Sequence, residues 1–107
     1  YWGRVYHERG RGWLWQDGLP AGAVVRGGWN TYEILAVGAR VETAVNGHWA
    51  VCLDDERGER RGFIALQLHG GIPAEVRFRR LRLETHPDPR LATVPPGAAP
   101  RPCRRAP

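Results

Sequence analysis

Two side chains with chemical capability, Gln67 and His69, lie in the most informative stretch of the chain, residues 62–71. The aliphatic residues of that stretch occupy the alternate positions Ile64, Leu66 and Leu68. Because side chains alternate between the two faces of a strand, the pattern predicts a strand that buries the aliphatics and presents Gln67 and His69 on an open face. Imidazole changes its charge near neutral pH, so His69 is the candidate general base, and Gln67 is a candidate for binding a hydroxyl group. The alternatives are a turn histidine that bonds the backbone beside Gly70-Gly71 and a half-exposed glutamine without a role.

Tryptophan supplies a second kind of candidate, because its ring can stack on a sugar. Trp13, Trp15 and Trp49 are the candidates for stacking, whereas Trp29 opens a strand at a position typical of a sandwich core. Core packing is the alternative for each of them.

A cluster of acidic residues invites a calcium-site interpretation, because hard cations need several oxygen ligands. The cluster comprises Asp54, Asp55, Glu56 and Glu59, interleaved with Arg57, Arg60 and Arg61. Since its spacing matches no known calcium loop, the sequence favours a solvated turn of mixed charge.

The elements that must position these side chains are strands. The pattern predicts two strands, residues 29–37 and 40–45, joined by a Gly-containing turn. Asn46-Gly47 then predicts a tight hairpin. A type I′ turn there would place Val45 opposite His48, Ala44 opposite Trp49 and Thr43 opposite Ala50. The residues then predicted to share one face are Val41, Thr43, Val45, Ala50 and Cys52, with Trp49 and Ala44 on the other.

A further strand is expected in residues 75–83, where the apolar positions change parity near Arg79-Arg80 and predict a β-bulge. The side chains expected to be buried on one side of the sheet are Ile34, Val45, Ile64, Leu66, Leu68, Val76 and Phe78. No stretch has the pattern of an amphipathic helix. Antiparallel strands joined by Gly-rich turns predict an all-β sandwich or jelly roll.

The C-terminal segment has a different composition, because seven of the nine prolines of the chain fall in residues 87–107. We therefore expect a disordered or polyproline-like tail that packs on nothing, with a domain boundary near residue 86. All basic residues of the chain are Arg. The tail holds over half of the net charge of +5, and this placement outside the expected folded part weakens the case for a nucleic-acid-binding surface. Cys52 and Cys103 are not expected to form a disulfide framework. No signal peptide can be read in the residues from Tyr1 onward, and no apolar run approaches the length of a membrane span.

Several segments together resemble the C-terminal half of the 3-keto-disaccharide hydrolase family. They are residues 29–34, Asn46-Gly47, residues 53–55, residues 64–71 and residues 76–79, with Tyr6, Glu8 and residues 10–12 upstream. The resemblance covers residues 1–86 and implies a concanavalin A-like β-sandwich that is truncated at its N-terminus. It also implies a secreted or periplasmic bacterial enzyme that acts on oxidised sugars. Ala44 departs from the family, which often has a large residue there, and Trp49 is the cross-strand neighbour that would compensate.

The family's chemistry implies particular roles. A ketone at C3 of a hexose acidifies the C2 proton, so a base can remove it and the enolate can expel the C1 substituent before water adds. His69 is the expected base, Glu8 the alternative base or general acid, and Arg11 the clamp for the enolate oxygen. The alternative for Glu8 and Arg11 is a surface ion pair without a catalytic role.

The expected partner of the chain is therefore a carbohydrate, bound by Arg11, Gln67, Trp49 and Trp13. No cofactor is predicted, a divalent metal stays open, and the oligomeric state is not indicated. Two other function classes compete with the enzyme: a carbohydrate-binding sandwich without turnover, and a basic nucleic-acid binder suggested by residues 9–12 and 26–28.

Overall fold

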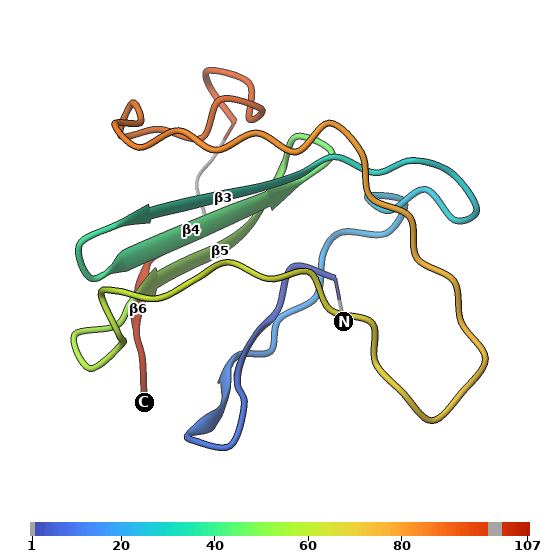
Figure 1. Cartoon of the computed structure of the whole chain (residues 1–107). Helices are drawn as coiled ribbons and strands as arrows, with labels where there is room; N and C mark the ends of the chain where they lie inside the picture. Colours follow the sequence, from blue (N-terminus) through green and yellow to red (C-terminus); the bar gives the residue numbers. More distant parts are fainter. Residues whose placement is uncertain (1, 99–101) are drawn as a thin grey trace.

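The residues that the structure describes form six strands in two sheets. Figure 1 shows how the strands are arranged. The structure, a computed structural model, describes residues 2–98 and 102–107. The strands are β1 (Val5–His7), β2 (Gly12–Trp15), β3 (Tyr32–Val37), β4 (Arg40–Val45), β5 (His48–Asp54) and β6 (Arg104–Arg105). Strands β1 and β2 pair alone, and the second sheet has the order β3-β4-β5-β6. The described residues contain no helix, which confirms the all-β class, and accordingly none that could cross a membrane.

The hairpin between β4 and β5 forms at the expected turn. Asn46 and Gly47 both have positive φ, 50° and 77°, as a type I′ turn requires, and Val45 lies opposite His48 as predicted. Ala44 lies opposite Trp49, also as predicted, and then the ladder shifts: Thr43 lies opposite Val51, where Ala50 was expected. The irregularity absorbs one extra residue of β5 and changes the side on which the following residues point.

The shift corrects the predicted position of Cys52. This residue lies opposite Glu42 in the ladder, so it does not share a face with Val41 and Thr43 as predicted. Val51 and Leu53 take that face instead, because their partners across the ladder are Thr43 and Val41. Cys52 and Glu42 consequently meet on the opposite side of the sheet, where both are buried.

The core lies between the two sheets. Its fully buried members come from β2 and β5: Trp15, Ala50, Val51 and Leu53. Partly buried residues pack around them: Val5, Leu14, Leu19 and Ala106. The β1–β2 pair therefore covers one face of β5, a two-layer arrangement consistent with a β-sandwich.

Residues 62–86 form no strand, and the prediction of two strands there is wrong. Ile64 is 79% exposed, Leu66 52% and Phe78 49%, and Ile34 on β3 is 65% exposed. The segment follows an irregular path in Figure 1, from yellow to orange. Alternation fixes which side chains share a face, but a strand also needs a neighbouring strand to bond, and this segment pairs with none of the described strands. The expected bulge corresponds only to a backbone irregularity, a φ of 55° at Arg80.

The C-terminal segment is attached to the sheet, so the expectation that it packs on nothing is wrong. Strand β6 pairs in parallel with β5, and a disulfide joins Cys103 to Cys52, which corrects the expectation for the cysteines. Leu91 is buried, and the Glu33 carboxylate accepts hydrogen bonds from the backbone N–H of Ala92 at 2.6 Å and of Thr93 at 2.9 Å. Proline excludes regular ladders without preventing such anchors. The boundary at residue 86 stays a prediction.

Candidate functional site

His69 lies in the irregular segment and is exposed, as is Gln67. The His69 Nδ1 atom lies 2.7 Å from the Gly70 carbonyl oxygen. Because a carbonyl oxygen only accepts, this hydrogen bond requires the proton on Nδ1 and leaves Nε2 as the basic nitrogen of the neutral ring. This contact is the one expected of a turn histidine. It is also compatible with His69 acting as a base through Nε2, since the residue is exposed. No sheet face separates Gln67 and His69 from the aliphatics, since the strand is not formed.

Glu8 and Arg11 belong to the turn between β1 and β2, but they do not pair with each other. Glu8 is exposed. The guanidinium of Arg11 instead grips Asp55 with two hydrogen bonds, from Nη1 to Oδ1 at 2.8 Å and from Nη2 to Oδ2 at 2.5 Å. Its Nε donates to His7 Nδ1 at 3.2 Å. Hydrogen bonding by Arg11 lowers the pKa of the Asp55 carboxyl, against the opposing effect of desolvation.

This grip fixes the Arg11 side chain and uses both of its terminal nitrogens. The Asp55 carboxylate neutralises much of the positive charge of Arg11 that would stabilise an enolate oxygen. To bind the enolate oxygen, Arg11 would have to give up at least one of its hydrogen bonds to Asp55. The pair joins residues 44 positions apart and ties the β1–β2 turn to the end of β5.

Trp13 forms an aromatic pair that the sequence analysis missed. Its ring meets that of Tyr6 edge to face at a centroid distance of 5.0 Å, and the Arg4 guanidinium lies 6.0 Å from the Trp13 centroid. Tyr6 and Trp13 are direct partners in the β1–β2 ladder. A predicted pairing of these two short strands would have revealed the contact.

Trp49 is half-buried on β5, opposite Ala44 as predicted. Its indole Nε1 is buried without a hydrogen-bond partner in the described part of the chain. A buried indole N–H without a partner is uncommon, because such donors are usually hydrogen-bonded.

An open hollow of about 410 Å³ lies near the N-terminal strand, lined by Trp2, Arg4, Leu19, Val24 and Arg26 among others. Its volume suits a small ligand. None of the predicted site residues lines it. Among the described residues, no hydrogen bond or ion pair joins His69 to Glu8, Arg11 or Gln67, so the structure does not assemble the predicted residues into one linked group.

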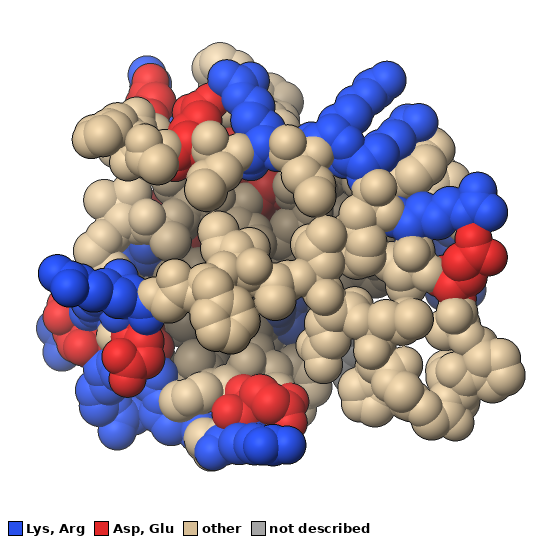
Figure 2. Space-filling view, in the orientation of Figure 1, with Lys and Arg blue, Asp and Glu red and all other residues tan. Residues whose placement is uncertain are grey.

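The acidic cluster is neutralised by arginines. Asp54 accepts two hydrogen bonds from Arg40, at 2.9 and 3.0 Å, Asp55 is held by Arg11, and Glu56 lies 3.8 Å from Arg60. This pairing agrees with the predicted mixed charge, but Asp55 is buried, so the expectation that the whole turn is solvated is wrong. On the face shown in Figure 2, Arg side chains lie around the rim with Asp and Glu among them, and the described residues of that face form no continuous basic stripe.

One family model matches the chain, over residues 1–84, and its description is 3-keto-alpha-glucoside-1,2-lyase-like domain. No curated protein and no solved structure matches.

Proposed function

From the premise that the chain belongs to the family of 3-keto-alpha-glucoside-1,2-lyase-like domains, we propose that it is the glycoside-cleaving part of an enzyme acting on 3-keto-sugars. The match over residues 1–84 is the observation that carries this proposal. The substrate class is a disaccharide or other glycoside whose C3 hydroxyl is already oxidised to a ketone.

The reaction is an elimination followed by hydration. A base removes the C2 proton, and the electron pair of that bond forms an enolate stabilised by the C3 carbonyl. The enolate re-forms the ketone as a C1–C2 double bond is made and the C1–O bond breaks, and the leaving oxygen takes a proton. Water then adds hydroxide to C1 and a proton to C2, so the net change is hydrolysis of the glycosidic bond. Because the ketone is already present in the substrate, these steps use acid–base groups without a redox cofactor.

His69 is the proposed base. Its Nδ1–H is directed to the Gly70 carbonyl oxygen, which leaves Nε2 to take the C2 proton. Glu8 is the second acid–base candidate, and its exposure leaves it accessible to a sugar. Arg11 and Gln67 are proposed for polar contacts, and a divalent metal remains open.

The rings are proposed to hold the sugar. The Tyr6–Trp13 pair offers an apolar wall of the kind on which a pyranose stacks. Trp49 pairs with Ala44, on the side of the sheet opposite the β1–β2 pair, and is proposed as a separate stacking ring. The same wall would serve a carbohydrate-binding domain without turnover, which is the alternative function.

An exported location is proposed as well. The Cys52–Cys103 disulfide supports it, because disulfides persist in oxidising compartments.

The test is sugar release from a 3-keto-disaccharide, measured beside exchange of the C2 proton with deuterium in heavy water. His69→Ala is expected to lower both rates by about 100-fold or more, the usual contribution of a general base. His86→Ala is the matched control, since His86 is also an exposed histidine outside the proposed site. Full activity in His69→Ala would move the base role to Glu8, to be checked with Glu8→Gln. A wild-type chain that binds the sugar without exchange or cleavage would establish the alternative function.

A further inference from the structure

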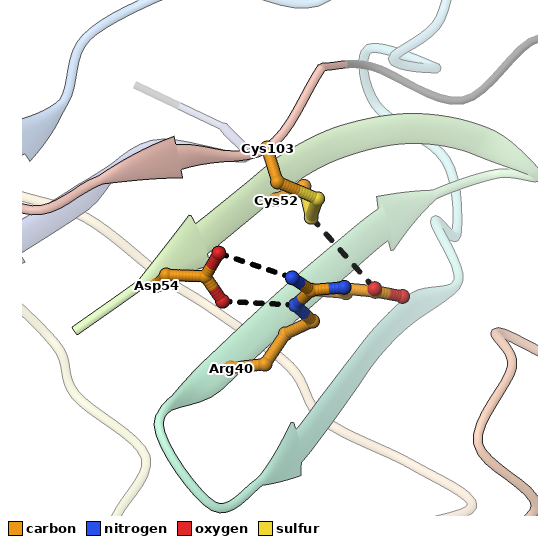
Figure 3. Close-up of a disulfide and its surroundings, with 5 residues drawn as sticks. Arg40, Cys52, Asp54 and Cys103 are labelled. Atoms are coloured by element: carbon orange, nitrogen blue, oxygen red, sulfur yellow. Dashed lines mark hydrogen bonds and ion pairs between the residues drawn. A yellow bond between two sulfur atoms is a disulfide. The ribbon is translucent and has the colours of Figure 1, made fainter. Parts of the chain in front are cut away.

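Three ligand-type atoms gather on the side of the sheet away from the core. They are Cys52 Sγ, Cys103 Sγ and a carboxylate oxygen of Glu42, and all lie within 4.8 Å of one another. In residues 2–98 and 102–107 this is the one group of His, Cys, Asp or Glu side chains with metal-ligand spacing. Figure 3 shows the disulfide, with the contact from its sulfur to the carboxylate drawn as a dashed line.

Glu42 is unusual because it is a buried carboxyl that forms no ion pair with any residue of the described ranges. Its residue is 8% exposed, and its contact is Cys52 Sγ at 3.7 Å. A disulfide sulfur carries no proton, so this contact gives a carboxylate little stabilisation. Arg40, the basic residue closest in the ladder, directs Nε and Nη2 to Asp54, as Figure 3 shows. Burial consequently raises the pKa of Glu42.

Contacts other than the sulfur–sulfur bond also hold Cys103 beside Cys52, so we expect the two residues to stay close when the bond is reduced. Strand β6 pairs with β5 directly after Cys103, and the Ala106 N–H donates to the Asp54 carbonyl oxygen at 2.8 Å. The Arg104 guanidinium forms an ion pair with Asp17 at 2.6 Å and lies 4.4 Å from the centroid of the Trp15 ring.

Reduction would turn the cluster into a set of metal ligands. A dithiol reductant gives two electrons and two protons to the disulfide and becomes a disulfide itself, leaving two thiols beside Glu42. Thiolates bind Zn²⁺ at about 2.3 Å and carboxylates at about 2.0–2.2 Å, so small side-chain movements suffice to close the set. Cys103 is the exposed member of the group, so an ion would approach from its side; the hollow of about 200 Å³ beside Glu42 is lined by Arg40 and by neither cysteine.

We propose that, in the reduced chain, Cys52, Cys103 and Glu42 form a binding site for one thiophilic divalent cation such as Zn²⁺. Binding releases the thiol protons, and the cation gives Glu42 the positive partner that the oxidised chain lacks. An exported chain has its cysteines as thiols until it meets an oxidising compartment, so the ion and the disulfide are alternative occupants of the same place.

The experiment uses the full chain, reduced with a phosphine that is then removed without air, and titrated with Co²⁺ as a spectroscopic probe. The expected result is one equivalent bound, with thiolate-to-cobalt charge-transfer absorption and the visible bands of tetrahedral cobalt, and displacement by Zn²⁺. The oxidised chain is expected to show neither signal.

Variants separate the three ligands. Glu42→Gln is expected to weaken Co²⁺ binding at least 10-fold, whereas Glu59→Gln, a change of the same type at an exposed position, leaves it unaltered. Cys103→Ser, which keeps the Cys52 thiolate, is expected to weaken both binding and the charge-transfer band. Equal affinity in Glu42→Gln and wild type, or Co²⁺ bound without a thiolate band, would overturn the site. If reduction unfolds the chain, Zn²⁺ must restore the circular dichroism of the native sheet in wild type and not in Glu42→Gln, and failure to do so refutes the proposal equally.

Discussion

The Cys52–Cys103 disulfide should contribute a large share of the stability of this chain. It closes a loop with a sequence separation of 51 residues. The chain-entropy relation for a loop of that length gives about 14 cal/mol/K, or about 4 kcal/mol at 25 °C. A domain of this size has a total unfolding free energy of about 5–15 kcal/mol, so the reduced chain should remain folded with a much smaller margin.

Cys103→Ala is the variant that tests this value. Cys103 is exposed, so its truncation leaves the core unchanged, and Cys52 stays buried as a thiol. The assay is chemical denaturation followed by circular dichroism, under oxidising and under reducing conditions. The oxidised wild type should exceed Cys103→Ala by about 4 kcal/mol in unfolding free energy, less whatever order the unfolded chain retains.

Reduction supplies the internal control. It should lower the stability of the wild type to that of Cys103→Ala and should leave Cys103→Ala unchanged. Equal midpoints for the two oxidised proteins would refute the reasoning, because they would mean that the crosslink restricts nothing in the unfolded chain.

Three further results are expected. Leu53→Ala should cost about 2–5 kcal/mol in a denaturant titration, because Leu53 is 2% exposed in the core, and a cost below 1 kcal/mol would contradict the packing between the sheets. Asn46→Ala should cost about 1–3 kcal/mol, since it loses hydrogen bonds to Ala23 and Thr31 and leaves Ala at a φ of 50°; Asn46→Gly should recover only the backbone part. Burial would raise the pKa of Glu33, but hydrogen bonds from Thr93 outweigh it and lower the pKa below 4.5. The ionised Glu33 therefore stabilises the fold above that pH, and this stabilisation is lost as the pH falls through the folded pKa. Thermal melts should show that the higher melting temperature of wild type relative to Glu33→Gln disappears in acid.

Local signals accounted for the parts of the fold that were predicted correctly. Asn46-Gly47 specifies its turn through residues that tolerate positive φ, and the adjacent pairs followed from it. The face of Cys52 was predicted wrongly, because nothing in the sequence marks Ala50 as the extra residue of the ladder.

Distant partners explain what could not be predicted. Alternation at Ile64 and Leu66 gave no information on whether a neighbouring strand was available to pair with them. The Arg11–Asp55 pair and the Cys52–Cys103 bond join residues far apart in sequence, and a single sequence contains no signal of such contacts. The candidate site depends on the same kind of information. The family resemblance named His69 and Glu8, while the Tyr6–Trp13 pair emerged only once β1 and β2 were aligned.

The parallel pairing of β6 with β5 has a consequence for the order of folding. Strands β3, β4 and β5 follow one another through short turns, so their ladders can close soon after residue 54 is synthesised. Strand β6 lies about fifty residues later, and until it arrives Leu53 and Asp54 lack their partner strand at the end of β5. In the interval between those two events this end of β5 is open to pairing with another copy of the chain, and formation of the Cys52–Cys103 bond marks the end of that interval.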